Sequence, residues 1–253
     1  IVSFLLLAMT GLPLRYASAP SAQFLSGLLG GEPTMRGIHF ICAAITFGYF
    51  FVHLCVIAYR FITTRDFRMF YGVDSLVPNY QDLVDMVNNF AWFLYLKPRP
   101  KLGRWTYWEK FDYWAVFWGV AMIGVSGLML AFPTHTARLL PGQLLNVAAV
   151  IHGEEALLAV GFIFVFHFFH NHLRPENFPM DITIFTGRLS LARFKEERSV
   201  QYEELVAEGK LDQLLVGPPS KTVSVIATIF GTIVVIVGLV LIAAVFETIL
   251  TAH

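Results

Sequence analysis

Charged side chains are scarce in this chain. Asp, Glu, Lys and Arg make up 14% of its 253 residues, whereas hydrophobic residues make up 56%. A soluble domain usually has about 25% charged residues, so this composition excludes an ordinary soluble fold of this length and predicts a protein that lies in lipid. The formal net charge is zero, and most of the charged residues fall between the apolar stretches and form no basic face. No nucleic-acid partner is therefore expected.

The sequence also has few of the motifs that mark other metalloproteins. Its two cysteines, Cys42 and Cys55, lie thirteen residues apart in one apolar stretch, too far apart to bridge within a helix. There is no CxxCH motif, which argues against covalently attached c-type haem, and no HExxH motif, which argues against a zinc protease. We predict no catalytic residue from the sequence.

Long apolar runs are what the chain does contain, at residues 1–12, 37–61, 113–132, 145–170 and 223–250. The last four are each long enough to cross a hydrocarbon core about 30 Å thick. The sequence therefore predicts an all-α, integral membrane helical bundle. The first run stops at Gly11 and Pro13 and is too short to span, and the chain opens on Ile in mid-helix, so we expect an N-terminal piece to be missing. A signal peptide is not expected, because no basic leader or small-residue cleavage site is present.

Basic residues predict how the bundle is oriented. All but three of the 18 Lys and Arg residues lie at the end of the second run or follow the second and fourth runs; the exceptions are Arg15, Arg36 and Arg138. The positive-inside rule then makes the two long connections and the N-terminus cytoplasmic and the C-terminus periplasmic. Residues 79–96 show the spacing of an amphipathic helix lying on the inner membrane surface, and 189–215 predict a short cytoplasmic helix. The expected segments are a transmembrane bundle at 1–172 with a cytoplasmic loop at 63–110, a second loop at 173–221, and a C-terminal transmembrane helix at 222–253.

Four histidines form matched pairs in the second and fourth runs. His39 and His53 are fourteen residues apart, and His152 and His167 are fifteen apart. At about 100° and 1.5 Å per residue, each spacing returns the second imidazole to within about 60° of the first, about 21 Å further along the helix. In parallel helices His39 would face His152. In the same way His53 would face His167, which predicts two sites, each held by two imidazoles.

Haem suits such sites, because it is a large apolar disc that a helical bundle can enclose and its iron takes axial imidazole ligands. With both axial positions filled, the iron has no open position for oxygen, so electron transfer is the expected task. We therefore predict two non-covalent haem b groups. Any one of these residues alone could be a hydrogen-bonded core histidine, but a matched quartet at membrane depth favours ligation because buried polar groups there are costly and usually functional.

Four stretches carry a family resemblance: SFLLLAMTGLPLRY, MRGIHF with the later FVHL, EKFDYWAVFWGVAMIGVSGLMLAFP, and HGEEALLAVGFIFVFHFFHNHLRPENFPMD. They are spread over residues 3–181, about two-thirds of the chain. In these stretches the chain resembles the di-haem cytochrome b subunits of membrane formate dehydrogenases, nickel-iron hydrogenases and thiosulfate-reductase-type bacterial cytochromes b. The resemblance implies a bacterial inner-membrane subunit with four haem-binding core helices plus a fifth transmembrane helix. It also implies electron exchange between a membrane quinone and a periplasmic multihaem cytochrome or iron-sulfur subunit. Such a subunit belongs to a quinone-linked oxidoreductase complex and is not catalytic alone.

The predicted orientation puts His39 and His152 near the outer membrane surface and His53 and His167 near the inner one, so we call the two expected groups the outer and the inner haem. The resemblance leaves open which residues hold the inner haem. Members of the family often supply a ligand from an RxxHW stretch upstream of the first helix, which would precede Ile1. An upstream histidine could then pair with His167 or His170, leaving His53 for another role or a third haem. The similar spacing on the two helices favours His53 with His167, as does an analogy with respiratory-complex cytochrome b.

Other residues near the expected sites are weaker candidates for binding haem propionates or a quinone. Arg36 could neutralise a haem propionate, and His170, His172 and Arg174 could do so at the inner haem or form part of a quinone pocket. For the two arginines, snorkelling to the membrane interface is an equal alternative.

Two rival functions also fit part of the pattern. HFFHNH resembles the histidine boxes of membrane di-iron desaturases and oxygenases, although such sites need about eight clustered histidines by that resemblance. A metal transporter could use the histidine pairs as a path, but it would be expected to carry midplane carboxylates or broken helices.

Overall fold

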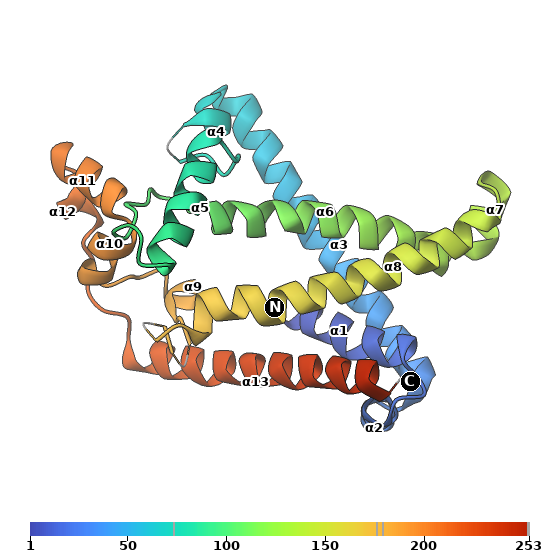
Figure 1. The fold of residues 1–253 in the computed structure, drawn as a ribbon. Coiled ribbons are helices and arrows are strands. Elements are labelled where there is room, and N and C mark those ends of the chain that lie inside the picture. Colours follow the sequence, from blue (N-terminus) through green and yellow to red (C-terminus); the bar gives the residue numbers. More distant parts are fainter. Residues whose placement is uncertain (73, 176, 179, 252–253) are drawn as a thin grey trace. The chain divides into compact units, whose positions relative to one another are not determined.

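The computed structural model describes residues 1–72, 74–175, 177–178 and 180–251. Every regular element in this part of the chain is helical (Figure 1), which confirms the all-α prediction. Four helices are long and apolar enough to cross a membrane, and together they indicate a multi-pass membrane protein. They are α3 (Gly31–Thr64), α6 (Tyr107–Ala131), α8 (Gln143–Phe162) with its π-helical continuation to Leu173, and α13 (Lys221–Thr251).

Helix α1 (Val2–Arg15) is longer than predicted. Gly11 and Pro13 were expected to end it, but both lie inside it, and its last turn is closed by the Tyr16 N–H, which donates to the Leu12 carbonyl at 2.9 Å. Pro13 is buried, so packing holds the ring in the helix despite the hydrogen bond that a proline cannot make. A helix of this length extends about 21 Å.

Several short helices were not predicted from the sequence. Two of them, α2 (Pro20–Leu28) and α7 (Pro133–Leu139), begin with proline at the first helical position, where its fixed φ is favourable and no N–H is needed. The others are α4 (Arg68–Tyr71) and α9 (Thr183–Thr186), each a single turn in a connection. These four helices shorten the irregular connections between the long helices, and none of them is long enough to cross a membrane.

The chain after α8 changes its helical period. It continues as two π-helical segments, η1 (Ile163–His167) and η2 (Phe169–Leu173), in which N–H groups bond five residues back. No proline or glycine occurs in this stretch, so nothing in the local sequence signals the change. The prediction that His167 follows His152 at a constant 100° per residue is therefore wrong, because a π-helix uses more residues per turn.

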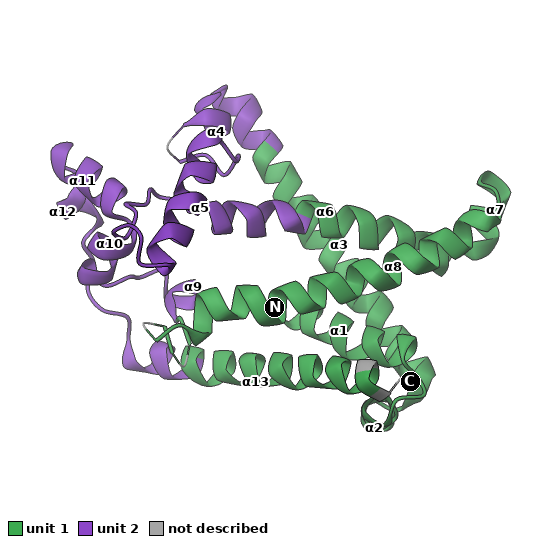
Figure 2. Ribbon diagram, in the orientation of Figure 1, with its two compact units in different colours: residues 1–57, 117–181, 227–253 green, residues 58–116, 182–226 purple. Residues whose placement is uncertain are grey.

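The chain forms two compact units (Figure 2), comprising residues 1–57, 117–181 and 227–253 in one and 58–116 and 182–226 in the other. The core of the first unit joins α1, the end of α8 and α13. Phe164 and Phe168 pack there against α13, where a Cβ at Gly238 would collide with both rings. The core members are Ala8, Val160, Phe164, Phe168, Val234, Val235 and Leu241.

The second unit brings the two long connections together. Glu109, in the first turn of α6, accepts two hydrogen bonds from the Arg198 guanidinium, at 2.7 and 2.6 Å. Further ion pairs join Arg99 to Glu196 and Lys101 to Glu203. The predicted helix at 79–96 is confirmed as α5 (Tyr80–Phe93), which begins with a capping box between Asn79 and Asp82.

The predicted single helix at 189–215 is instead three short ones, which are α10 (Leu191–Glu197), α11 (Ser199–Ala207) and α12 (Leu211–Leu214). Arg198 separates the first two with φ −127° and ψ 45°, outside the helical region, and from there it reaches Glu109. The break therefore coincides with an ion pair that joins segments distant in sequence.

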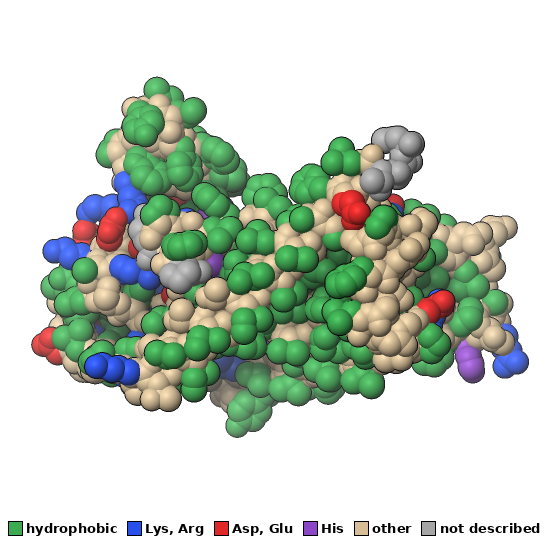
Figure 3. Space-filling view, turned by 90° about the horizontal axis from the view of Figure 1, so that it is seen from below, with side chains coloured by type: hydrophobic (Ala, Val, Ile, Leu, Met, Phe, Trp, Pro, Cys, Tyr) green, Lys and Arg blue, Asp and Glu red, His purple; other side chains and the backbone are tan. Residues whose placement is uncertain are grey.

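Apolar side chains remain exposed along the four long helices, including Phe51 on α3, Trp118 on α6, Leu158 on α8 and Ile236 on α13. Figure 3 shows hydrophobic side chains over much of one face of the molecule. A soluble protein rarely exposes so much contiguous apolar surface, so lipid is the solvent that suits these helices.

Candidate functional site

The structure brings His39 and His152 together. His39 lies on α3 and His152 on α8, and their ring centroids are 6.3 Å apart with an interplanar angle of 67°. A metal–imidazole nitrogen bond is about 2 Å long and the ring centre lies about 1 Å beyond the nitrogen, so two imidazoles on one metal have centroids about 6 Å apart. The observed separation therefore suits one metal ion between the two rings.

A buried hydroxyl orients His39. Thr10 on α1 is fully buried, and its Oγ1 lies 2.9 Å from Nδ1 of His39 and 2.6 Å from the Leu6 carbonyl oxygen. The carbonyl can only accept, so the hydroxyl donates to it and accepts from the Nδ1–H of His39. The Nε2 lone pair of His39 is then left for a metal.

The backbone of α6 orients His152 in the same way. Its Nδ1 lies 2.9 Å from the Ile123 carbonyl oxygen, which can only accept, so this nitrogen carries the proton. Ser126 Oγ is 3.4 Å from the same Nδ1 and 2.6 Å from the Met122 carbonyl oxygen. Metal-ligating histidines almost always donate their second N–H to such a carbonyl or hydroxyl, which fixes the ring and makes the ligand more basic.

Glycines leave room beside both rings. A Cβ at Gly11 on α1 would lie 3.3 Å from Cε1 of His39, and one at Gly127 on α6 would lie 2.9 Å from Cε1 of His152. Gly124, one turn earlier on α6, leaves similar room for the ring of Phe47. Four helices therefore build the site, two supplying imidazoles and two supplying their hydrogen-bond acceptors and the space around them.

An ion pair lies close to His152. Arg15, the last residue of α1, donates from Nη2 to Glu154 Oε1 at 2.5 Å, two residues after His152 on α8. Arg36, predicted as a propionate partner, is 2.8 Å from Glu32 on its own helix, with more than half of each side chain exposed. Arg15, and not Arg36, therefore forms an ion pair with a residue of α8 next to His152.

The second predicted pair is His53, which lies on α3, and His167, which lies at the end of η1. His53 is exposed on α3, with its ring centroid 6.1 Å from that of Phe117 on α6. His167 ends η1, and its Nδ1 lies 3.2 Å from the Asn171 amide nitrogen. The change to π-helical geometry just before His167 alters the direction of its side chain from the one that a regular α-helix would give.

The remaining candidates lie at or just beyond η2. His170 Nδ1 is 3.1 Å from the Phe166 carbonyl oxygen, and Arg174 is the residue that follows the helix, with extended backbone. His172 is 5% exposed and Asn177 is 7% exposed. Among the described residues, neither Nδ1 of His172 nor Oδ1 of Asn177 has a hydrogen-bond partner. Buried polar atoms without partners are uncommon and mark places where a ligand or water can bind.

No group of three or more His, Cys, Asp or Glu side chains among the described residues is arranged to hold a metal ion. A haem iron takes four nitrogens from the porphyrin and needs only two from the protein, so a paired-histidine haem site would not require such a group.

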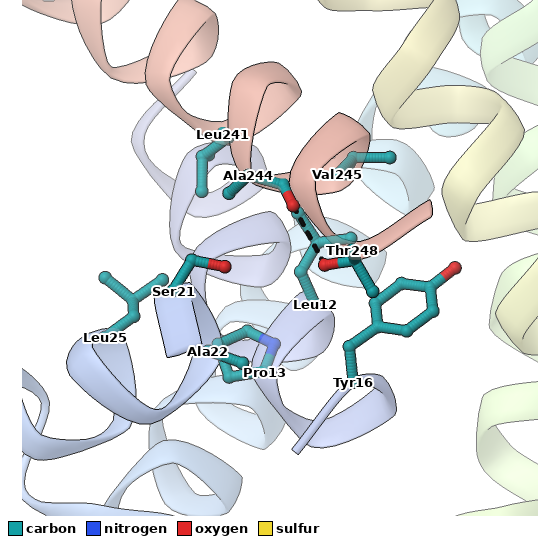
Figure 4. Close-up of a pocket in the computed structure, with 10 residues that line it drawn as sticks. All are labelled: Leu12, Pro13, Tyr16, Ser21, Ala22, Leu25, Leu241, Ala244, Val245 and Thr248. Carbon is teal, nitrogen blue, oxygen red and sulfur yellow. Dashed lines mark hydrogen bonds between the residues drawn. The ribbon is translucent and has the colours of Figure 1, made fainter. Parts of the chain in front are cut away.

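A small apolar pocket of about 20 Å³ lies elsewhere in the first unit, where α1, α2 and α13 meet (Figure 4). Thr248 contributes a hydroxyl to its wall, but this oxygen already bonds the Ala244 carbonyl at 2.9 Å. The lining residues are Leu12, Pro13, Tyr16, Ser21, Ala22, Leu25, Leu241, Ala244, Val245 and Thr248. None of the predicted site residues lies there.

Sequence reasoning missed Thr10, Gly11 and Ser126. Thr10 and Gly11 lie beside the ring of His39, and Ser126 lies beside that of His152. Thr10 and Gly11 stand in the SFLLLAMTGLPLRY stretch, where a lone polar residue in an apolar helix is the signal that could have found Thr10.

No protein-family model matches this chain, and no curated protein sequence matches it.

Proposed function

We propose that this chain is a membrane b-type cytochrome subunit that passes electrons between the quinone pool and a periplasmic redox partner through two bis-histidine b haems. The observation that carries the proposal is the His39–His152 pair. The two rings lie at the separation of axial ligands, and both Nδ1 atoms are engaged so that both Nε2 atoms are left for iron.

The residues around this pair fit the group. Haem supplies one-electron redox chemistry when it is bound. The chain's own residues hold two neutral imidazoles at a fixed angle, keep them in one tautomer through Thr10 and Ile123, and leave space beside them at Gly11 and Gly127. Filling both axial positions leaves the iron no position for oxygen and favours electron transfer.

The second haem rests on the sequence. His167 is its proposed ligand on η1, and His53 is the partner that the helix spacing favours, with an upstream residue as the other candidate. For the quinone, the buried Nδ1 of His172 and Oδ1 of Asn177 offer a nitrogen and an acceptor that no described residue bonds, as a quinone carbonyl and a quinol hydroxyl require. The proposed location is the bacterial inner membrane, and the proposed partner is a multihaem or iron-sulfur protein.

A reduced-minus-oxidised visible spectrum of the detergent-purified chain, with pyridine haemochrome quantification, tests this function. We expect two non-covalent b haems per chain, reducible by a quinol analogue. A protein without haem, or one that binds iron without porphyrin, would overturn the proposal and favour the di-iron or transporter alternative.

Removing the hydroxyl that orients His39 should weaken the outer haem without removing its ligand. Thr10→Val keeps the shape of the side chain but leaves Nδ1–H of His39 without an acceptor. We expect about 10- to 100-fold weaker haem binding at this site, the usual cost of losing such a partner, and a shifted midpoint potential for one haem of the two. Thr46→Val is the matched control, because the Thr46 hydroxyl bonds only the Cys42 carbonyl of its own helix among the described contacts. Identical potentials in both variants would contradict the assignment.

A further inference from the structure

Helix α5 carries an exposed apolar face. Five side chains, spaced three or four residues apart, line one side of this helix and continue into the turn after it, and each is between 57% and 79% exposed. These residues are Tyr80, Leu83, Val87, Phe90 and Leu94, which we call the α5 stripe. In an ordinary surface helix such a stripe faces the core.

The polar side of α5 is the buried side. Asp82 lies 2.9 Å from the ammonium nitrogen of Lys110 on α6, and both side chains are almost fully buried. Seven residues later, on the same face of α5, the Asn89 amide donates to the Tyr107 hydroxyl at 2.9 Å. This arrangement reverses that of a helix on a soluble protein, since the charges are inside and the apolar residues outside.

These contacts fasten α5 across the start of α6. Asp82 and Asn89 are about 10 Å apart along α5, whereas Lys110 and Tyr107 are only about 4.5 Å apart along α6. The two axes must therefore cross steeply, as Figure 1 shows. A helix that crosses the start of a membrane-spanning helix in this way lies close to the plane of the membrane surface.

Two tryptophans fix the position of the segment before α5 along the axis of α6. The indole N–H of Trp105, just before α6, donates to the Asp74 carbonyl at 3.1 Å, and that of Trp114, two turns into α6, donates to the Leu76 carbonyl at 3.0 Å. The segment leading into α5 is thus held beside the first turns of α6 and not beyond its end. Tryptophan is enriched at this boundary between hydrocarbon and water.

We propose that the α5 stripe lies in the interfacial region of the bilayer, in the leaflet where α6 begins, and contacts lipid acyl chains. We infer lipid as the partner of the stripe because α5 is held at the level of the first turns of a membrane-spanning helix. At that depth, the side of α5 that is turned away from α6 faces the membrane. The proposal does not depend on haem binding.

Spin labels on the full-length chain in vesicles of phosphatidylethanolamine and phosphatidylglycerol test the proposal. One label replaces Val87 (Val87→Cys) and the matched control replaces Gln81 (Gln81→Cys), exposed on the other side of the same helix. Both are made in a Cys42→Ala, Cys55→Ala background. Collision rates with oxygen, which concentrates in lipid, and with a water-soluble nickel chelate then report the surroundings of each label.

We expect an oxygen-to-nickel collision ratio that is several-fold higher at position 87 than at position 81. Equal ratios at the two positions would place the stripe in water and overturn the proposal. A label at position 87 shielded from both reagents would also overturn it, because a second copy of the chain or another protein would then cover the stripe.

Discussion

His39→Ala should remove one of the two proposed b haems. The imidazole supplies one of two axial ligands at the outer site, and a methyl group cannot replace it, so we expect the pyridine haemochrome value to fall to about half and quinol-driven electron transfer through the chain to be lost. His152→Ala should remove the same haem, because the two rings lie 6.3 Å apart on one site. Residues that act as a unit are not additive, so the double variant should lose no more haem than either single one.

The matched control for this prediction is His135→Ala. His135 lies on the short helix α7, outside both predicted pairs, with its ring beside Phe132. Full haem content in this variant and half in His39→Ala would support the assignment. Loss of both haems in His39→Ala with the fold intact, or loss of neither, would contradict it.

Gly127→Leu should displace His152 and disrupt the outer haem while leaving every ligand in the sequence. Even the Cβ of a larger residue would lie 2.9 Å from Cε1 and 3.1 Å from Nδ1 of the imidazole, so the ring must move and its bond to the Ile123 carbonyl must stretch. We expect loss of most of the outer haem, or a changed electron paramagnetic resonance signal from the fraction that remains. Productive metal-site geometry tolerates displacements of only about 0.5 Å.

Gly119→Leu is the matched control on the same helix. A Cβ at Gly119 meets no atom within 4 Å, so the same substitution adds a side chain to α6 without touching a histidine. Both variants share any change in helix propensity, which leaves the haem signal as the difference between them. A normal outer haem in Gly127→Leu would show that the room beside His152 is not part of the site.

The outer and inner histidine pairs show where the spacing in sequence predicts the direction of a side chain and where it does not. In the structure His39 faces His152, as predicted, because α3 and α8 are regular helices around these residues and periodicity alone sets the direction of their side chains. His167 lies beyond the point where the helix becomes π-helical, so a constant 100° per residue does not apply there. That stretch includes Phe164, which packs with the α13 helix some seventy residues further along the chain, and no local rule contains this contact.

The all-helical fold and the four apolar helices could be predicted from the sequence, because hydrophobic length depends only on consecutive residues. The histidine pair of the outer site and the amphipathic helix α5 could be predicted as well. Three features came from the folded chain: Thr10 and the Ile123 carbonyl orient those histidines, the two long connections pair through Glu109 and Arg198, and α5 buries its polar face. These features join residues far apart in the chain, and whether a polar group finds its partner depends on packing between helices, which no local pattern encodes.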